Sequence, residues 1–441
     1  MPFRARRPWL APVLSAAFFV SLAADDSVVA RAAGSPAHGA GRVIYAFLGG
    51  SDGIGPVSQL AVDEAGVLSG TTSYGGGTSC TGGEGGCGTI FSVTPSGSGF
   101  SESILYRFEG SVMGPMPSGL ISVQNVYYGS AADGGTYNQC DYGIGCGYVY
   151  QLAPSSSGYS STTLHSFNGS DGAFPEAVPL KTNAVMYGTT SGGGVHCQGS
   201  GFNGNGCGVI YSMNVDGSSF ADLYYFAGGL DGWAPAGPLI MDKSGAIYGT
   251  TMLGGGFACG DTGCGTVFKL TPAGSGYTES VLYRFRCCND GIFPAGSLLP
   301  QGSALFGTTV SGGTYNHGTV FKLERAKSAY KETFLYSFHG GKDGLEPNAE
   351  LVADNSGAVY GTTQYGGGNG CGGTGCGTVF KLARTGSGYS ESILYRFEAG
   401  ARNPSGGLTL FASALYGTTF SGGNISACPP NGCGTVYEIT L

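Results

Sequence analysis

Residues 246–285 read AIYGTTMLGGGFACGDTGCGTVFKLTPAGSGYTESVLYRF, and this stretch decides the fold class. It holds three short runs rich in β-branched and aromatic residues, at 246–251, 265–270 and 279–285, separated by loops of Gly, Pro, Ser and Cys. A further run at 236–241 precedes them across an Asp-Lys-Ser-Gly turn. Such runs with short Gly-containing connections predict strands that pair with their chain neighbours. The stretch is therefore predicted to be a four-stranded antiparallel meander.

The same unit recurs along the chain. Three of its elements, Leu-Tyr-x-Phe, Tyr-Gly-Thr-Thr and Gly-Thr-Val-Phe, each occur seven times with small variations, at intervals of about 59 residues. The final phenylalanines of the first element are Phe47, Phe108, Phe167, Phe226, Phe285, Phe338 and Phe397. A period of this length with four strands per repeat is typical of a β-propeller, in which each repeat forms one blade.

The two ends of the repeat region complement each other. The region opens with a lone fourth strand at 42–47 and closes with a lone third strand at 434–441. The first strand can therefore complete the last unit and remove an exposed edge. The predicted fold is all-β: a seven-bladed β-propeller with four antiparallel strands per blade and the N-terminal strand closing the last blade. The alternative, an open solenoid, would need atypical polar end caps, and no such repeat stands at either end.

Composition excludes several other classes of protein. Glycine supplies 85 of the 441 residues, which is too many for a helical bundle because glycine destabilises helix interiors. The glycines show no three-residue period, so the chain is not collagen-like. The 26 tyrosines and 24 phenylalanines argue against disorder.

The first residues predict export. Arg4, Arg6 and Arg7 precede an apolar run at 9–24, which is typical of a secretory signal peptide. The predicted organisation is a signal peptide at 1–24, a flexible segment at 25–41 and the propeller at 42–441. No other segment is long and apolar enough to span a membrane. A net charge of −8 without a basic stripe argues against a nucleic-acid partner. We expect a monomer that is secreted, periplasmic or at the cell surface.

Four motifs together resemble the GloVer-type tandem repeat, also called the choice-of-anchor tandem-repeat family, over residues 42–441. They are Leu-Tyr-x-Phe, Asp-Gly-x-x-Pro, Tyr-Gly-Thr-Thr-x-x-Gly-Gly and Gly-Thr-Val-Phe-Lys-Leu. The resemblance implies a secreted bacterial repeat protein, and members often carry a C-terminal anchoring tail. This chain ends inside its last predicted strand, so a freely secreted or periplasmic protein is predicted.

Most of the 14 cysteines form pairs in the loops between the second and third strands of a unit. Close pairs in an exported protein predict disulfides. The predicted pairs are Cys80/Cys87, Cys140/Cys146, Cys197/Cys207, Cys259/Cys264, Cys371/Cys376 and Cys428/Cys433. Zinc is the rival interpretation, but it needs four ligands at one place, whereas these pairs are distributed among the blades. No metal or other cofactor is predicted.

Three recurring or substituted positions are interpreted as structural. Asp-Gly recurs in the loops that lead into a new blade, as at Asp52 and Asp290, and is typical of a turn, with calcium binding as the alternative. Glu and Arg recur on fourth strands, as at Glu102 and Arg107, and are interpreted as charges that protect an outer edge. His165 replaces the tyrosine of Leu-Tyr-x-Phe and is predicted to be a packed or edge side chain.

The fifth unit departs most from the repeat. Its first loop carries Cys287 and Cys288, and its second loop, which has no cysteine pair, carries Tyr315, Asn316 and His317. A short unbridged loop beside longer bridged loops predicts a notch in the rim. Because loops on a rigid scaffold carry specificity, these five residues are the predicted ligand-binding residues. The sequence leaves open whether Cys287 and Cys288 form a vicinal disulfide.

No set of catalytic residues is recognised in the sequence. The predicted function is that of a secreted, non-enzymatic binding or scaffold propeller for an extracellular glycan, peptide or protein. The alternative is a carbohydrate-active enzyme, either a polysaccharide lyase or a glycoside hydrolase. Such an enzyme would need two carboxylates, or a Tyr/His/Arg set, converging at one end of the axis.

Overall fold

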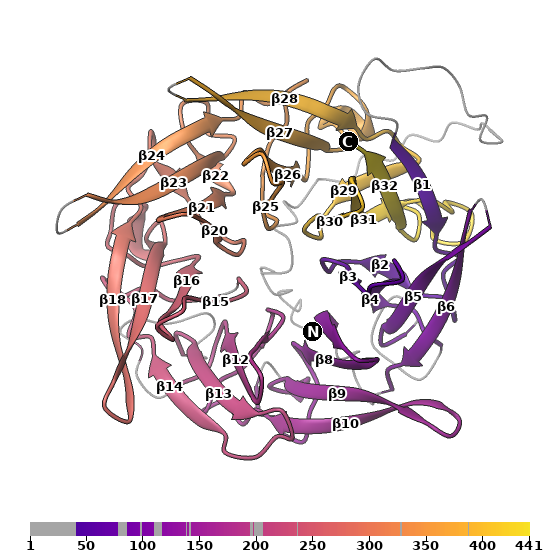
Figure 1. The fold of residues 1–441 in the computed structure, drawn as a ribbon, viewed down its shortest axis with the longest axis horizontal. Coiled ribbons are helices and arrows are strands. Elements are labelled where there is room, and N and C mark those ends of the chain that lie inside the picture. The colour runs from indigo at the N-terminus through magenta and orange to yellow at the C-terminus, as the bar shows by residue number, and fades with distance from the viewer. Residues whose placement is uncertain are drawn as a thin grey trace, which may run out of the picture.

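The structure is a computed structural model that describes residues 41–77, 86–97, 99–109, 117–137, 139–140, 143–194, 197, 206–235, 237–326, 329–386 and 388–441. These residues form seven antiparallel sheets of four or five strands, arranged as blades around one axis (Figure 1). The predicted seven-bladed propeller is therefore confirmed. The predicted signal peptide lies outside the described residues. Within them, no helix is long and apolar enough to cross a membrane.

The first four blades each run from an inner strand to an outer strand. Blade 1 contains β2 (Ile54–Pro56), β3 (Ala61–Val62), β4 (Leu68–Tyr74), β5 (Thr89–Ser96) and β6 (Gly99–Arg107). Blade 2 contains β7 (Pro117–Val123), β8 (Val126–Ala131), β9 (Tyr148–Ser155) and β10 (Gly158–Ser166). Blade 3 contains β11 (Leu180–Lys181), β12 (Val185–Thr190), β13 (Val209–Asn214) and β14 (Ala221–Tyr225). Blade 4 contains β15 (Ile240–Met241), β16 (Ile247–Thr251), β17 (Thr266–Ala273) and β18 (Gly276–Arg284).

The last three blades keep this order. Blade 5 contains β20 (Leu299–Gln301), β21 (Ala304–Thr309), β23 (Thr319–Ala326) and β24 (Ala329–Ser337), with β19 (Gly291–Ile292) and β22 (Ser311–Gly312) as a separate pair. Blade 6 contains β25 (Val352–Ala353), β26 (Val359–Thr363), β27 (Thr378–Thr385) and β28 (Gly388–Arg396). Blade 7 contains β29 (Ala401–Pro404), β30 (Thr409–Phe411), β31 (Ala414–Gly422) and β32 (Thr435–Thr440). Two 3-10 turns, η3 (Gly260–Thr262) and η4 (Cys371–Gly373), lie in loops.

The N-terminal strand closes the ring, as predicted. β1 (Gly41–Ala46) pairs antiparallel with β32 and forms the outer strand of blade 7 (Figure 1). Phe47, directly after β1, is fully buried and donates its N–H to the Gly434 carbonyl at 3.0 Å. Because β1 pairs with β32 along this ladder, the outer side of β32 is not an unpaired edge.

One aromatic contact repeats at all seven blade junctions. The phenylalanine of Leu-Tyr-x-Phe packs edge-on against the aromatic residue of Gly-Thr-Val-Phe in the next blade, with ring centroids 4.9–5.2 Å apart. The pairs are Phe47–Phe91, Phe108–Tyr150, Phe167–Tyr211, Phe226–Phe268, Phe285–Phe321, Phe338–Phe380 and Phe397–Tyr437. The Leu-Tyr-x-Phe and Gly-Thr-Val-Phe elements therefore each supply one ring of the aromatic pair in the core between two blades.

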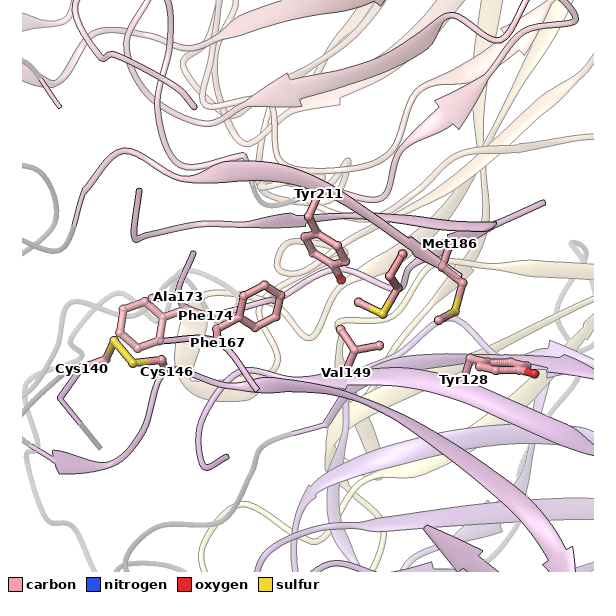
Figure 2. Close-up of a cluster of buried hydrophobic side chains, with 10 residues drawn as sticks. Tyr128, Cys140, Cys146, Val149, Phe167, Ala173, Phe174, Met186 and Tyr211 are labelled. Carbon is pink, nitrogen blue, oxygen red and sulfur yellow. A yellow bond between two sulfur atoms is a disulfide. The ribbon is translucent and has the colours of Figure 1, made fainter. Parts of the chain in front are cut away.

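Figure 2 shows the buried cluster between blades 2 and 3. Phe167 and Tyr211 lie side by side within it, with the Cys140–Cys146 bridge at one end and Tyr128 at the other. Comparable clusters lie at the other six junctions. The hydrophobic core is therefore distributed between blades, and each blade depends on both neighbours for burial of its faces.

The innermost strand of blade 4 is shorter than the sequence predicts. The predicted strand at 236–241 is observed only at its end, as β15. The segment that precedes the innermost strand of a blade contacts the neighbouring blade. In blade 5, the Gly296 carbonyl of this segment accepts a hydrogen bond from the Thr250 hydroxyl of blade 4 at 3.3 Å. Because carbonyls in this inner segment accept bonds from the neighbouring blade, the segment does not form a long ladder within its own blade.

Candidate functional site

Two sets of loops emerge on one face of the ring, which we call the loop face. The first set enters each blade from the previous one (entering loops), and the second joins the second and third strands of a blade (bridged loops). They pair directly: β19 pairs with β22, and isolated bridges join Ala173 to Gly192 and Trp233 to Leu253. The loop face therefore brings together the two regions in which the sequence placed its candidate residues.

The aspartates of the entering loops hold the turn. Asp290 accepts hydrogen bonds from the Tyr283 hydroxyl at 3.0 Å and from the Arg286 N–H at 2.7 Å. Asp231 and Asp343 each accept the same two hydrogen bonds, one from the tyrosine hydroxyl of the preceding outer strand and one from a backbone N–H of the loop. The tyrosine is that of Leu-Tyr-x-Phe. The repeated carboxylate thus fixes the loop to the outer strand of the preceding blade, which is the predicted turn role.

His165 takes the place of this tyrosine in blade 2. Its Nε2 lies 3.0 Å from the Asp171 carboxylate, and its ring stacks on Phe220 with centroids 3.6 Å apart. The prediction that it is a packed side chain is confirmed.

The Glu and Arg residues of the outer strands lie at junctions and are not simple edge charges. Glu102 is half-buried beside Asp52 and the Tyr45 hydroxyl, and burial together with the Asp52 charge raises its pKa to about 7. Arg107 is exposed and donates from Nε to the Ser51 carbonyl of the entering loop at 3.0 Å. The sequence showed the alternation of these residues but not that the entering loop covers their face.

Five predicted cysteine pairs lie at disulfide distance within their own bridged loops. They are Cys140–Cys146, Cys197–Cys207, Cys259–Cys264, Cys371–Cys376 and Cys428–Cys433. Cys87 is also disulfide-bonded, and Cys80, its predicted partner, lies outside the described residues. The adjacent Cys287 and Cys288 are likewise at disulfide distance in the loop entering blade 5.

The five predicted ligand residues belong to two loops that are in contact. The Gly313 N–H donates to the Asp290 carbonyl at 2.8 Å, which ties the Cys287–Cys288 loop to the loop of Tyr315, Asn316 and His317. Asn316 has a φ of +58° and accepts a bond from the Gly312 N–H at 3.2 Å. Asn316 therefore shapes its own turn through its side chain.

His317 partly fills the space where the sequence predicts a notch. A Cβ on Gly340 would lie 2.8 Å from the His317 ring, whereas at the equivalent Gly49 it would lie 2.8 Å from Sγ of Cys428. The imidazole thus occupies the position of the disulfide at another junction. The opening expected from the missing cysteines is correspondingly reduced.

Tyr315 forms the exposed part of this sector. Its side chain is 48% exposed, and its ring lies over that of His339 with centroids 4.1 Å apart. His339 is itself half-exposed and approaches the Asp343 carboxylate at 3.1 Å through Nδ1. The exposed rings of Tyr315 and His339 therefore lie together between blades 5 and 6, and the Asp343 carboxylate that holds the loop also contacts His339.

A cavity of about 780 Å³ runs along the propeller axis and is lined by the inner segments of all seven blades. Its charged wall residues are Glu176, Glu350 and Lys181. Burial raises the pKa of Glu350. Two carboxylates, from blades 3 and 6, thus line the same cavity.

The residue before the entering-loop proline adopts a left-handed backbone conformation in several blades. The non-glycine examples are Phe174, Ala234, Phe293, Glu346 and Asn403, with φ between 54° and 62°. Such a conformation is uncommon for residues with a side chain. In each case the N–H donates to a carbonyl of the preceding blade, as from Glu346 to His317 at 3.0 Å. The strain therefore accompanies an inter-blade hydrogen bond.

The Gloeobacter/Verrucomicrobia repeat model matches residues 201–374 and 259–441, which together make up more than half of the sequence. The chain belongs to this repeat family. A search of curated proteins finds no match to the sequence.

Among solved structures, the repeat protein is similar to a chain of a nidogen/laminin complex, with 15% identity, a TM-score of 0.39 and coverage of 68% of this chain and 87% of that chain. It is also similar to the computationally designed Ika8 protein, with 10% identity, a TM-score of 0.45 and coverage of 90% and 99%. A putative 6-phosphogluconolactonase from Bacteroides fragilis shows 10% identity, a TM-score of 0.45 and coverage of 79% and 85%.

Sequence reasoning missed a group of polar residues in blades 6 and 7 of this Gloeobacter/Verrucomicrobia repeat protein. Asn348 donates from Nδ2 to Oε1 of the buried Gln364 at 3.0 Å, and Asn403 donates to the Gln364 carbonyl at 3.4 Å. Glu346 has a buried carboxylate oxygen, and burial raises its pKa to about 7. These residues could have been found by aligning the units, because glutamine at 364 stands where blade 4 has Met252 and blade 5 has Val310.

Proposed function

We propose that this protein is a secreted binding propeller whose loop face binds an extracellular glycan at the junction of blades 5 and 6. The observation that supports the proposal is the outward-facing ring pair of Tyr315 and His339. Flat aromatic surface with polar neighbours supplies contact area at low entropic cost. Cys287, Cys288, Asn316 and His317 complete the proposed site.

The rest of the repeat supports a scaffold role for the remaining blades. The residues that recur in each unit make the turn and inter-blade contacts described above, and disulfides constrain the bridged loops. The disulfides are consistent with an oxidising, extracellular compartment. A rigid ring with one divergent junction concentrates specificity at that junction.

The experiment is a glycan-array screen of the mature chain, followed by affinity measurement on the best glycan. Tyr315→Ala is expected to weaken binding about tenfold, the equivalent of a lost stacking contact. Tyr137→Ala is the matched control, because Tyr137 is a 44% exposed tyrosine in the bridged loop of blade 2. An array without binding, or equal effects of the two substitutions, would overturn the proposed site.

A carbohydrate-active enzyme is the second candidate, and one observation favours it. Glu176 and Glu350 both line the axial cavity, and two carboxyl groups on one cavity are what glycoside cleavage requires. A depolymerisation screen that shows sugar release by the intact chain and none by Glu350→Gln would establish this alternative.

A further inference from the structure

The exposed charges beside the Tyr315–His339 ring pair are basic. Lys342 follows His339 in the loop that enters blade 6, and its side chain is exposed. Arg396, at the end of β28 on the outer edge of the same blade, is also exposed and donates from Nε to the Lys342 carbonyl at 3.1 Å. Two positive charges therefore belong to, or contact, the loop that carries His339, in a protein whose net charge is −8.

A series of contacts joins the lysine to the aromatic pair. The ring centroids of Tyr315 and His339 are 4.1 Å apart, and His339 contacts the Asp343 carboxylate through Nδ1 at 3.1 Å. The Asp343 N–H donates to the Gly340 carbonyl at 3.2 Å, which closes a tight turn that contains Lys342. The two rings and the lysine therefore lie on one small segment of the loop face.

The carboxyl groups of the same junction are turned away from solvent. The Asp343 side chain is only 14% exposed and accepts hydrogen bonds from its own loop and from the preceding strand. Glu391 on β28 is half-buried; burial and the Asp343 charge outweigh the effect of Arg396 and raise its pKa to about 7, so this group is only partly ionised near neutral pH. Residues 311–318 and 339–346, which the structure describes completely, contain no exposed aspartate or glutamate.

The two cations lack an anionic partner. Among the residues that the structure describes, neither Lys342 nor Arg396 forms an ion pair, and the exposed Glu398 of the next junction pairs with neither of them. In this part of the chain only Nε of the Arg396 guanidinium has an acceptor, so its Nη groups keep their donors. Such a fork matches two oxygens of a carboxylate or sulfate, and the flexible lysine side chain supplies a second charge.

The equivalent arginines of other blades have uncharged neighbours. Arg107 donates to the Ser51 carbonyl in blade 1 at 3.0 Å. Arg284 donates to the Leu230 carbonyl in blade 4 at 2.9 Å. Because the arginine contact recurs and the lysine does not, the contact is a structural feature of the repeat, and Lys342 is what distinguishes blade 6.

We propose that the glycan bound at the junction of blades 5 and 6 is anionic, with a sugar ring packed on Tyr315 and His339 and an acid group bound by Lys342 and Arg396. This ligand class rests on the proposed glycan site. Charge complementarity speeds association and favours ligands of the matching sign. Two kinds of glycan supply such an acid group, one through a uronate carboxylate and the other through a sulfate ester.

Four probes distinguish these sources in calorimetric titrations of the mature chain at neutral pH and low salt. They are a galacturonate tetramer, its methyl-esterified counterpart, a sulfated galactose tetramer and its desulfated counterpart. At least one anionic probe is expected to bind, and its neutral counterpart at least about tenfold more weakly, because one charged hydrogen bond has this magnitude. Added salt should weaken binding of the anionic probe. Whichever anionic probe binds identifies the acid group.

Two variants locate the acid group on the protein. Lys342→Gln and Arg396→Gln are each expected to weaken binding of the anionic probe about tenfold. Arg284→Gln, which removes the equivalent arginine of blade 4, is the matched control and should have no effect. A thermal scan of each variant checks folding, and Lys342→Gln keeps the test open should Arg396→Gln fail to fold, because the Lys342 side chain is exposed.

Failure of the anionic class and failure of the glycan site give different results. If neutral glycans bind as tightly as the anionic probes, or if both charge variants keep full affinity, the anionic class is wrong, while the dependence of binding on Tyr315 remains. If no glycan binds, or if Tyr315→Ala and Tyr137→Ala have equal effects, the proposed glycan site is wrong and its ligand class is overturned with it.

Discussion

The Tyr-Gly-Thr-Thr element shows how single residues set the geometry of a blade. At Gly249 a Cβ would lie 2.6 Å from the Phe268 ring, so glycine is needed for the inter-blade aromatic contact. The threonine at 250 bonds to the next blade, and Thr251 bonds to Thr266 at 2.7 Å and to the Leu253 carbonyl at 2.9 Å. The glycine and the two threonines of the element therefore each have a separate structural function.

Thr251→Val tests this assignment at the residue scale. Both threonines of the Thr251–Thr266 pair are fully buried, so valine removes two hydrogen bonds and leaves the Thr266 hydroxyl without this partner. The free energy of unfolding is expected to fall by about 1–3 kcal/mol, measured as a lower denaturant midpoint. Thr262→Val is the control, because Thr262 is an exposed threonine with one bond of 3.3 Å, and its midpoint should be unchanged. Equal midpoints for the two variants would contradict the assignment.

At the scale of elements, the outer strands of blades 4, 5 and 6 each present a carboxyl group to the loop that enters the same blade. Glu279, Glu332 and Glu391 lie beside Asp231, Asp290 and Asp343, respectively, and burial raises the pKa of all three. Glu332 has no arginine among its neighbouring charges, and its pKa reaches about 8. The sequence shows that Glu and Asp recur, but their proximity depends on how the entering loop folds back on the strand. That contact joins residues about 40–50 positions apart.

These carboxyl groups predict a stability maximum in mild acid. The folded pKa of Glu332 is about 8 against an ordinary value of 4.5, so its stabilising contribution is complete below pH 4.5 and is lost as the pH rises through 8. Asp242 has the opposite effect on the pH dependence. Burial raises its pKa, but hydrogen bonds from Ser244 and Tyr248 outweigh burial and lower the pKa to about 2. Its stabilising contribution is therefore lost as the pH falls through 2. The unfolding midpoint is therefore expected to peak near pH 4.

Glu332→Gln is the corresponding variant. It is expected to raise stability at pH 8 to 9 by about 1 kcal/mol, a value held down by the partial exposure of the site and by solvent screening, and to leave stability at pH 4 unchanged. Glu324→Gln, an exposed carboxylate on the same blade, should leave the pH profile as it is. Denaturant midpoints at four pH values provide the measurement, and a Glu332→Gln profile that overlays the wild-type profile would contradict the assignment.

At the scale of the whole molecule, the sequence predicts the ring because repetition makes each junction alike. The seven units, the strand order and the closing strand all follow from a period and two incomplete ends. The axial residues could not be predicted in the same way. Glu350 and Gly407 belong to consecutive units, and nothing in either unit indicates that their inner segments meet at the axis. His317 likewise fills a space whose shape depends on Gly340 in another loop.

The last prediction concerns the closure of the ring by β1. Blade 7 combines this N-terminal strand with the C-terminal strands β29 to β32. A chain that begins at residue 48 lacks the ladder between β1 and β32 and the Phe47 ring, which packs 5.0 Å from Phe91. Loss of a buried phenylalanine alone costs about 3–5 kcal/mol, and the freed β32 edge can pair with other molecules. We expect a lower melting temperature and concentration-dependent aggregation relative to a chain that begins at residue 41. A synthetic peptide of residues 41–47 should restore the melting temperature, whereas a scrambled peptide should not. Only a strand of the right sequence can complete both the ladder and the aromatic contact. Equal rescue by the two peptides would therefore contradict the prediction. So would a chain beginning at residue 48 that stays monomeric and keeps the full melting temperature.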